Sequence, residues 1–317
     1  MKSLGFVFPG QGSQSVGMLA SIAQEYPIVK TTFDEASSAL GYNLWELTQE
    51  GPAEELNKTI HTQPALLAAS YAIWRIIQSQ TNIKPALLAG HSLGEYSALT
   101  CANAIAFSDA VKLVAARGFF MQEAVPVGEG ALAAIVGLDD AVVNTLCEKA
   151  ALFGEVLAPA NFNCPGQVVI AGKKIAVERA IILAKESGAK IATLLPVSVP
   201  SHCSLMKPAA ERLAEVLETI TIHTPTIPIL NNVDVAIYTD ANSIRSGLLR
   251  QLYMPVRWVE TIQALIKTGI TQIVECGPGK VLSGLNKRIA PELQLTHTND
   301  LASLQAIFEE LHHVARK

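Results

Sequence analysis

A serine lies between two glycines in Gly90-His91-Ser92-Leu93-Gly94, after the apolar run 85–89 and before a helical pattern that begins at Glu95. This order predicts a strand, a sharp turn and a helix, with the glycines allowing the tight turn and the serine hydroxyl projecting from it. The first N–H groups of the helix would lie beside that hydroxyl. The pattern indicates a serine nucleophile for acyl carbonyls, with an ordinary loop serine as the alternative.

A serine hydroxyl becomes a good nucleophile only when a base accepts its proton, and His202 is the candidate for that base. It lies in the irregular stretch Val199-Pro200-Ser201-His202-Cys203, at the exit from a segment that we expect to form a small domain. A linker at this place must pass the cleft between the domains. The alternative is a histidine that caps the following helix or fills the hinge. His91 is next to Ser92, but in a sharp turn its side chain should point elsewhere and either pack or bond locally.

A third group usually holds the catalytic imidazole by accepting its other N–H. Three aspartates lie between Ser92 and His202, and each has the position of a residue at a helix N-terminus, where the helix dipole explains it. These acids are Asp109, Asp139 and Asp140. The orienting group is therefore expected to be a backbone carbonyl or an amide, such as that of Gln251.

The loop Pro9-Gly10-Gln11-Gly12-Ser13-Gln14 follows the first predicted strand, and its two glycines permit a close approach of backbone N–H groups. As a dinucleotide-binding fingerprint the loop fails, because Ser15 stands where the third glycine is needed. We interpret it as an anion-stabilising loop. The N–H groups of Gln11 and Leu93 are then candidates to hold the oxygen of a tetrahedral intermediate.

Arg117 lies on an apolar helix face, in register with Ala110, Val114 and Met121. A guanidinium on such a face must find a partner, because an unpaired buried charge is very costly. One interpretation is an ion pair with a carboxylate of this chain. The other is that the carboxylate belongs to the substrate, which the planar guanidinium binds through two parallel hydrogen bonds.

Apolar strands alternate with helical patterns along most of the chain, which predicts an α/β fold, here an α/β-hydrolase-like large domain with a mainly parallel sheet. Strands are expected at 4–8, 86–89, 227–230 and 270–276, and helices at 62–79, 205–217, 243–252 and 259–267, among others. The segment 131–197 reads strand, helix, strand, strand, helix, strand, which is the ferredoxin-like βαββαβ order. We expect a discontinuous large domain, 1–127 with 198–317, and an inserted small domain, 128–197, with the site in the cleft between them.

Asn161 and Asn163 precede Cys164-Pro165-Gly166-Gln167 in a stretch that we expect to be the turn of the small domain's central hairpin. Turn asparagines are usually structural, because their side chains bond to the nearby backbone. The alternative is that both side chains face the cleft.

The composition argues against several classes of function. With 317 residues, of which 50% are hydrophobic and 16% charged, the chain is long enough to bury a large core. A net charge of −4 and a pI near 6.0 do not favour broad binding to nucleic acid or to a membrane surface. The five cysteines are scattered without Cys-x-x-Cys spacing, and no apolar run is long enough for a signal peptide or a membrane span, so a cytoplasmic protein is expected.

Taken together, the motifs resemble those of the malonyl-CoA:acyl-carrier-protein transacylases of dissociated bacterial fatty-acid synthesis. The matching segments follow the family's order and cover nearly the whole chain: Gly10–Gln14, Gly90–Tyr96, Arg117, Asn161–Gly166, Pro200–Cys203, Gln251–Tyr253 and Gly277–Lys280. Some family members carry Phe where this chain has Ser201, a position that helps to shape the acyl pocket. The resemblance also implies the inserted ferredoxin-like domain, and no metal or redox cofactor.

The resemblance implies a role for each site residue. Ser92 would be the acylated nucleophile and His202 its base, with the backbone carbonyl of Gln251 orienting the histidine. Arg117 would bind the free carboxylate of the malonyl group. The N–H groups of Gln11 and Leu93 would form the oxyanion hole, and we assign Asn161 and Asn163 to substrate binding.

The expected reaction is a ping-pong exchange in which malonyl-CoA acylates Ser92 and the phosphopantetheine thiol of acyl carrier protein then takes the malonyl group. The expected partners are therefore malonyl-CoA and acyl carrier protein, and we expect a monomer. Two alternatives are a serine thioesterase or esterase with the same serine and histidine, and a non-catalytic scaffold that binds the carrier. Lys280, Lys287 and Arg288 are candidates for docking an acidic carrier, with an ordinary solvated face as the alternative.

Overall fold

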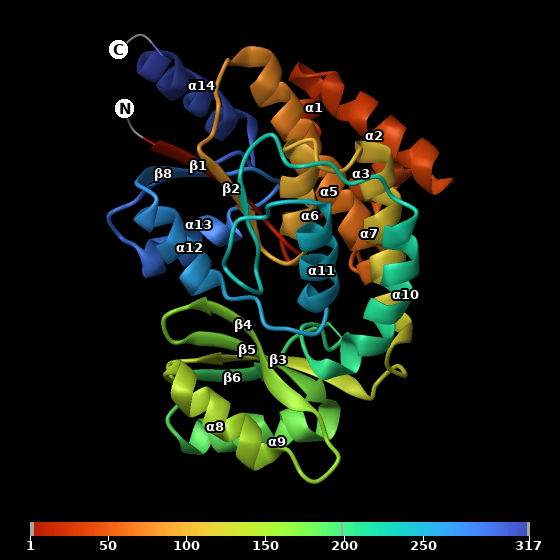
Figure 1. The fold of residues 1–317 in the computed structure, drawn as a ribbon, viewed down its shortest axis with the longest axis vertical. Helices are drawn as coiled ribbons and strands as arrows, with labels where there is room; N and C mark the ends of the chain where they lie inside the picture. The colour runs from red at the N-terminus through yellow and green to blue at the C-terminus, as the bar shows by residue number, and fades with distance from the viewer. Residues whose placement is uncertain (1–2, 198, 316–317) are drawn as a thin grey trace.

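A five-stranded parallel sheet forms the centre of the larger part of the molecule (Figure 1). The computed structural model describes residues 3–197 and 199–315. The strand order is β7 (Ile229–Leu230), β2 (Leu87–Gly90), β1 (Ser3–Phe8), β8 (Ile270–Glu275) and β9 (Gln294–His297), and every neighbouring pair runs parallel. The predicted α/β fold with a mainly parallel sheet is confirmed.

Helices cover both faces of this sheet, as the twofold period of a buried strand requires. From β1, Phe6 and Phe8 enter the core formed with α5, α6 and α7, whereas Val7 enters a second core formed with α12 and α13. The helices of this part are α1 (Ala20–Glu25), α2 (Ile28–Leu40), α3 (Leu44–Glu50), α4 (Ala53–Leu56), α5 (Thr59–Gln80), α6 (Leu93–Cys101), α7 (Phe107–Glu123), α10 (Lys207–Glu218), α11 (Ala241–Gln251), α12 (Trp258–Lys267), α13 (Val281–Ile289) and α14 (Leu301–Ala315). None of the described helices is long and apolar enough to cross a membrane.

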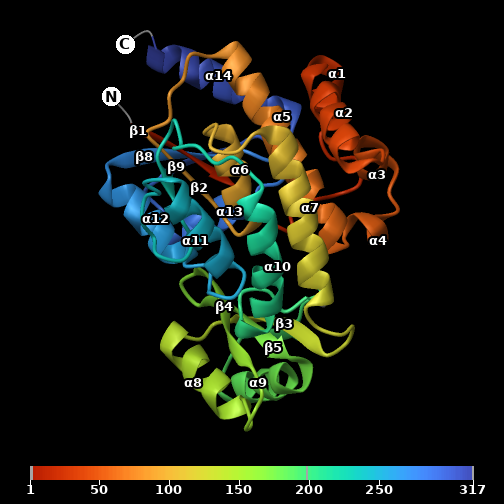
Figure 2. The ribbon, with the colours of Figure 1, turned by 45° about the vertical axis from the view of Figure 1, so that its right-hand side comes forward.

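A second, antiparallel sheet lies at the other end of the molecule from β1 and α14 (Figures 1 and 2). Its strand order is β4 (Leu157–Cys164), β5 (Gln167–Lys173), β3 (Gly130–Val136) and β6 (Ile191–Leu194). Helices α8 (Asp140–Ala150) and α9 (Lys174–Glu186) pack on its outer face. Along the chain the elements follow the order β3, α8, β4, β5, α9, β6, as the sequence predicts.

The inner face of the antiparallel sheet looks toward the parallel sheet. On β3, Ala133 and Ile135 enter the core under α8 and α9, so the alternating residues Leu132 and Ala134 point the other way and line a cavity. Strand β4 is tied to the larger part by backbone hydrogen bonds with Val256 at 2.8 and 2.9 Å. The two sheets therefore face each other across a defined space.

The structure corrects the position of two asparagines. Asn161 and Asn163 lie within β4 and not in the hairpin turn, which is made by Pro165 and Gly166. The ladder of β4 with β5 continues to Cys164 and tolerates two irregularities of register. Pairing on both edges therefore outweighs the turn preference of asparagine, which is a local tendency only.

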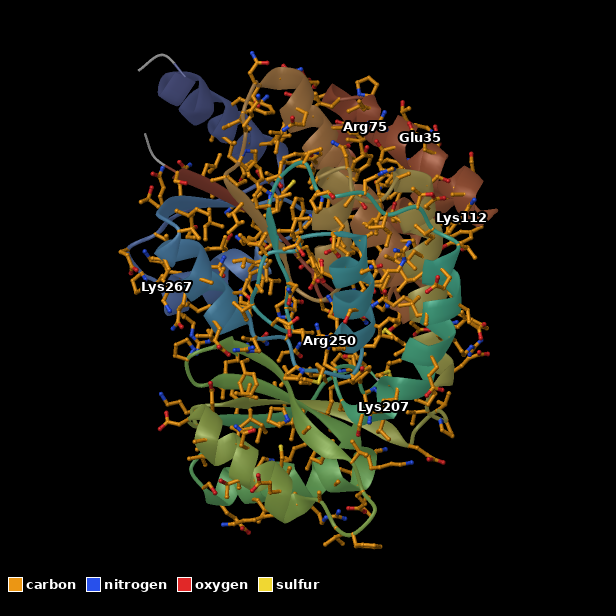
Figure 3. All side chains as sticks on the ribbon, viewed as in Figure 1. Glu35, Arg75, Lys112, Lys207, Arg250 and Lys267 are labelled. Carbon is orange, nitrogen blue, oxygen red and sulfur yellow. The ribbon has the colours of Figure 1, made fainter. Side chains whose placement is uncertain are left out.

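Four elements were not expected from the sequence: α3, α4, β9 and α14. Arg75 of α5 and Glu35 of α2 form a partly exposed ion pair of 2.9 Å (Figure 3). Such exposed pairs contribute little to stability, because water screens both charges. The packing of the two cores therefore matters more for holding the sheets in place.

Candidate active site

A cavity of about 280 Å³ lies between the carboxyl ends of the parallel strands and the inner face of the antiparallel sheet. In parallel sheets the carboxyl ends of the strands are the usual place for ligands. Its lining contains all the side chains predicted for the site except Gln251: Gln11, Ser92, Leu93, Arg117, Asn161, Asn163 and His202. Gln251 lies directly behind it and contacts Ser92, His202 and Arg117.

Ser92 occupies the sharp turn between β2 and α6, with φ 52° and ψ −109°. A non-glycine residue with positive φ is strained and persists only when its surroundings hold it there. Gly90 and Gly94 make the turn possible, because a Cβ on Gly90 would lie 1.9 Å from the carbonyl carbon of Gly94, and one on Gly94 would lie 2.0 Å from the Phe8 oxygen. The predicted strand, turn and helix are confirmed.

His202 and Ser92 form a hydrogen-bonded pair, with 2.8 Å between Nε2 and Oγ. The other ring nitrogen, Nδ1, lies 2.7 Å from the backbone oxygen of Gln251. Since a carbonyl only accepts, Nδ1 carries the hydrogen and Nε2 presents a lone pair to the serine hydroxyl. This is the tautomer that a general base needs.

The imidazole of His202 is only 3% exposed. Burial, together with the positive charge of Arg117, lowers the pKa of His202 to about 3. The histidine is therefore neutral, and competent to accept a proton, throughout the usual working range of pH.

Two side chains hold the backbone of Ser92 from both sides. Asn232 Oδ1 accepts from the Ser92 N–H at 2.7 Å, and Gln251 Nε2 donates to the Ser92 carbonyl at 3.0 Å. Asn232 also donates to the Gly90 carbonyl at 2.6 Å. Sequence reasoning missed Asn232, although it lies two residues after β7 at the carboxyl edge of the sheet, where ligand-contacting residues usually lie.

Arg117 is 1% exposed and has no carboxylate within ion-pair distance in the described part of the chain. Its guanidinium donates to the side-chain oxygens of Gln63 at 2.8 Å and Gln251 at 3.0 Å, and to Ser92 Oγ at 3.3 Å. Its Nε is buried without a partner. The alternative of a direct internal ion pair is therefore wrong, and the cation is left with neutral acceptors next to the serine.

Gln11 and Leu93 line the same cavity as Ser92, and their backbone N–H groups are the predicted oxyanion donors. Neither donates a hydrogen bond within the described residues. Leu93 N–H belongs to the first residue of α6, where backbone donors have no partner within the helix. Both are therefore available to an oxygen bound beside Ser92.

His91 makes its side-chain hydrogen bond with Asn163 of β4 and not within its own turn, so of the two predicted alternatives, packing and local bonding, the structure supports packing. Its Nε2 lies 2.8 Å from the side-chain oxygen of Asn163, and its ring packs edge-on against Trp258 with centroids 5.4 Å apart. Burial lowers the pKa of His91. The pair joins the turn of the parallel sheet to β4 of the antiparallel sheet along one wall of the cavity.

The three basic residues expected to dock a carrier lie at or in α13. Arg288 donates to Gln167 at 2.6 Å and to the Pro165 carbonyl at 3.3 Å, and Lys287 donates to the Pro291 carbonyl at 2.7 Å. Lys280 stands immediately before the helix. Arg288 thus bridges α13 to the β4–β5 turn, beside the cavity wall.

The described residues contain no group of three or more His, Cys, Asp or Glu side chains that could hold a metal ion. All five cysteines are buried and free. Burial raises the pKa of the Cys203 thiol to about 11, so this neighbour of His202 is no thiolate nucleophile.

Comparison with known proteins gives consistent similarities over the whole chain. A family model described as "Acyl transferase domain" matches residues 5–293. The malonyl CoA-acyl carrier protein transacylase of Salmonella typhimurium is 60% identical over 306 residues, covering 96% of this chain and 99% of that protein. An acyl carrier protein S-malonyltransferase from Vibrio cholerae superposes with a TM-score of 0.94 at 58% identity, covering 96% and 99% of the two chains. A malonyl-transacylase in complex with a type II PKS acyl-carrier protein superposes with a TM-score of 0.96 at 56% identity, covering 97% and 99%.

Proposed function

This chain belongs to the acyl transferase family and, within it, to the malonyl CoA-acyl carrier protein transacylases, and we propose that it moves a malonyl group from malonyl-CoA to the phosphopantetheine thiol of an acyl carrier protein. The observation that carries this proposal is the state of Arg117. A buried cation with only neutral partners, next to a serine nucleophile, is a binding site for an acyl group that ends in a carboxylate. An esterase that acts on uncharged acyl groups would not need a buried cation beside its serine.

In the first half-reaction, His202 Nε2 takes the proton of Ser92 as Oγ attacks the thioester carbonyl of malonyl-CoA. A C–O bond forms, and the carbonyl oxygen becomes an oxyanion for which the N–H groups of Gln11 and Leu93 are the donors. The C–S bond then breaks, and His202 delivers its proton to the CoA thiolate. The product is a malonyl-serine ester whose carboxylate remains on Arg117.

In the second half-reaction, His202 takes the proton of the carrier's phosphopantetheine thiol, and the thiolate attacks the ester carbonyl. The same two N–H groups hold the new oxyanion. When the C–O bond breaks, Ser92 Oγ regains its proton from His202. One thioester and one thiol stand on each side of the overall equation, so the transfer needs no external source of energy and no cofactor.

Asn161 and Asn163 line the cavity that also holds Ser92, and we propose that they bind substrate. Asn163 is held by His91, whereas Asn161 lies where β4 meets Val256, so both are fixed in place on paired backbone. Fixed polar groups of this kind orient a substrate without the entropy cost of ordering a loop.

We propose the same architecture as from the sequence: an α/β-hydrolase-like large domain, 1–127 with 198–317, and a ferredoxin-like small domain, 128–197. The order β3, α8, β4, β5, α9, β6 supports the second assignment. Ser198, at the boundary, lies outside the described residues. Because one chain supplies every group that the two half-reactions use, we propose a monomer, and the unpaired thiols support a cytoplasmic location.

The test is the intact mass of the protein after mixing with malonyl-CoA, followed by addition of a phosphopantetheinylated carrier. We expect one malonyl adduct per chain, lost when the carrier is added and absent from the Ser92→Ala variant. Continuous release of CoA in water, without any carrier, would instead indicate a thioesterase. A chain that gains no adduct would be a scaffold.

A further inference from the structure

A second charged side chain, Glu95, is buried one helical turn after Ser92 and has no role in the reaction as derived so far. It is 0% exposed. We propose that Glu95 is a positioning residue for the transfer reaction: through Gln251 and Asn232 it holds the serine turn, and its negative charge balances Arg117. The inference rests on the proposed function, since the rate that it affects is the acylation of Ser92.

Both oxygens of the Glu95 carboxylate are engaged by donors. Oε2 accepts from Gln251 Nε2 at 2.8 Å and from the backbone N–H of Asn232 at 3.0 Å, and Oε1 accepts from the Tyr238 hydroxyl. Two of these donors belong to the residues that hold the Ser92 backbone from either side. The carboxylate therefore fixes the relative positions of Gln251 and Asn232, the two residues that hold the strained turn.

The amide of Gln251 also lies between Glu95 and Arg117. Its oxygen accepts from the Arg117 guanidinium at 3.0 Å, and its nitrogen donates to Glu95 at 2.8 Å. Opposite charges at the two ends orient and polarise the amide, because hydrogen bonds to ionised groups are the strong ones. The direct ion pair that Arg117 lacks is replaced by this amide-mediated pair.

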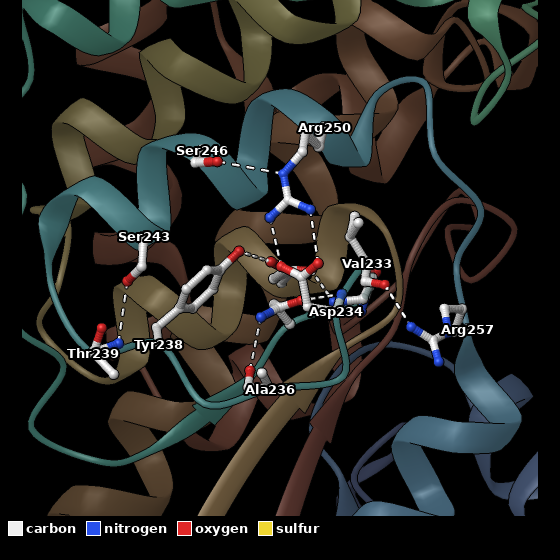
Figure 4. A network of polar contacts seen from close by, with 12 residues as sticks. Val233, Asp234, Ala236, Tyr238, Thr239, Ser243, Ser246, Arg250 and Arg257 are labelled. Atoms are coloured by element: carbon white, nitrogen blue, oxygen red, sulfur yellow. Dashed lines mark hydrogen bonds and ion pairs between the residues drawn. The ribbon is translucent and has the colours of Figure 1, made fainter.

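The loop that carries Asn232 and Tyr238 is held from outside by α11 (Figure 4). Arg250 NH1 donates to Asp234 Oδ1 at 2.7 Å, and its NH2 donates to Oδ2. Arg250 precedes Gln251 on α11, so one helix binds the loop on its outer side and the serine turn on its inner side. Movement of this loop would therefore break the hydrogen bonds that Asn232 and Tyr238 donate to Glu95.

Three titratable or charged groups face Glu95: Arg117 from α7, Tyr96 on its own helix, and Tyr238 from the loop. From α11 it meets the uncharged Gln251. Burial raises the pKa of Glu95 to about 7, and the hydrogen bonds from Tyr238, Gln251 and Asn232 together with the charge of Arg117 oppose that rise. The acylation rate should therefore fall as the pH drops through this pKa and Glu95 loses its charge.

The decisive variant is Glu95→Gln, which removes the charge and can keep the three contacts. Its amide oxygen can take the place of Oε2, and its NH2 group can face the Tyr238 oxygen. The measurement is the single-turnover rate of Ser92 acylation at saturating malonyl-CoA, from about pH 5.5 to about pH 8.5. We expect a loss of about tenfold at the alkaline end with little change in KM, and no acid limb near pH 7. At every pH, the acylation rate of Glu95→Gln should equal the low rate that the unsubstituted chain has below about pH 6, where its Glu95 is protonated.

Two further variants separate positioning from folding. Tyr238→Phe keeps the charge but removes a hydrogen bond that lowers the pKa of Glu95, so the acid limb should move to higher pH. Glu275→Gln is the matched control, because Glu275 is a carboxylate of 1% exposure that accepts from Leu282 and Ser283 at the start of α13, away from the serine. It should leave both the rate and the pH profile unchanged.

An acylation rate and pH profile in Glu95→Gln equal to those of the unsubstituted chain would overturn the inference. An acid limb of the pH profile that does not shift in Tyr238→Phe would also overturn it. The same holds if Glu275→Gln lowers the acylation rate as much as Glu95→Gln does. Failure of the proposed function is a separate result, because in that case the unsubstituted chain itself gains no malonyl adduct.

Discussion

Arg117 and His202 meet on one atom, because the guanidinium donates to Ser92 Oγ at 3.3 Å while that same oxygen lies 2.8 Å from His202 Nε2. The cation thus donates a hydrogen bond to the nucleophile and disfavours a second positive charge on the histidine. A substrate carboxylate that binds Arg117 offsets both effects. An acyl group that ends in a carboxylate should therefore favour proton transfer from Ser92 to His202 more than an uncharged acyl group does.

Replacement of Arg117 tests this relationship. In Arg117→Ala, acylation by malonyl-CoA should fall about 100-fold or more, since a buried charge-assisted pair is worth roughly 3 kcal/mol. Acylation by acetyl-CoA should be spared or improved, because no carboxylate is bound and the His202 pKa rises. CoA release measured with both thioesters gives the ratio. The control is Arg75→Ala, which removes a partly exposed arginine paired with Glu35. Equal losses for the two thioesters would contradict a carboxylate clamp.

Replacement of His202 tests the base. In His202→Gln the acylation rate should fall by a factor of about 10² to 10⁴, the usual contribution of a positioned general base. Binding of malonyl-CoA should persist, because Arg117 is intact. Stopped-flow release of CoA measures the rate, with His223→Ala, an exposed histidine, as the matched control. Should the two variants react at similar rates, another group must accept the serine proton.

Several catalytic and binding residues could be predicted from the sequence because they lie in short local motifs. The turn at Ser92 needs only a strand, two glycines and a helix within about a dozen residues, and each of these is a local pattern. Arg117 could be predicted as a candidate site residue because a charge on an apolar helix face needs a partner. The order of the elements followed from alternation of apolar runs and helical periods.

The support of the site could not be predicted in the same way, because it joins segments far apart in the chain. Ser92 and Asn232 are 140 residues apart, and the position of Asn232 just after a strand does not show that its side chain reaches the Ser92 turn. The second role of Gln251, through its side chain, depends on how α11 is placed against α6. Glu95 in particular reads as a common acid in the first turn of a helix, whereas the fold closes over it completely.

The pKa of His202 predicts how stability depends on pH. The pKa falls from an ordinary 6.5 to about 3 on folding, so between these values the unfolded chain binds more protons and the native state loses stability as the pH drops. The loss approaches ~1.4 kcal/mol for each pH unit. His202→Gln lacks this contribution, so its free energy of unfolding should fall less between about pH 6.5 and about pH 5. Urea titrations at several pH values measure the difference, and parallel curves for the two proteins would show that His202 is not held neutral by the fold.

Charge reversal on α13 tests the docking of the carrier. Arg288 and Lys287 lie on one helix beside the β4–β5 turn, close to the wall formed by Gln167, and an acidic carrier approaching that wall would meet them first. In Lys287→Glu, the KM for the carrier should rise about tenfold, because one favourable charge pair becomes a repulsive one. The rate of acylation by malonyl-CoA should not change, since that step does not involve the carrier.

Lys267→Glu is the matched control for this effect, because it makes the same change of net charge at an exposed position near the end of α12 (Figure 3). It should raise the carrier's KM much less than Lys287→Glu does. The rise in Lys287→Glu should also shrink as salt is added, since exposed charges more than about 10 Å apart are screened at ordinary ionic strength. If both variants behave alike, only the overall charge matters and the carrier docks on another face. A rise in the carrier's KM confined to Lys287→Glu would place the carrier against α13.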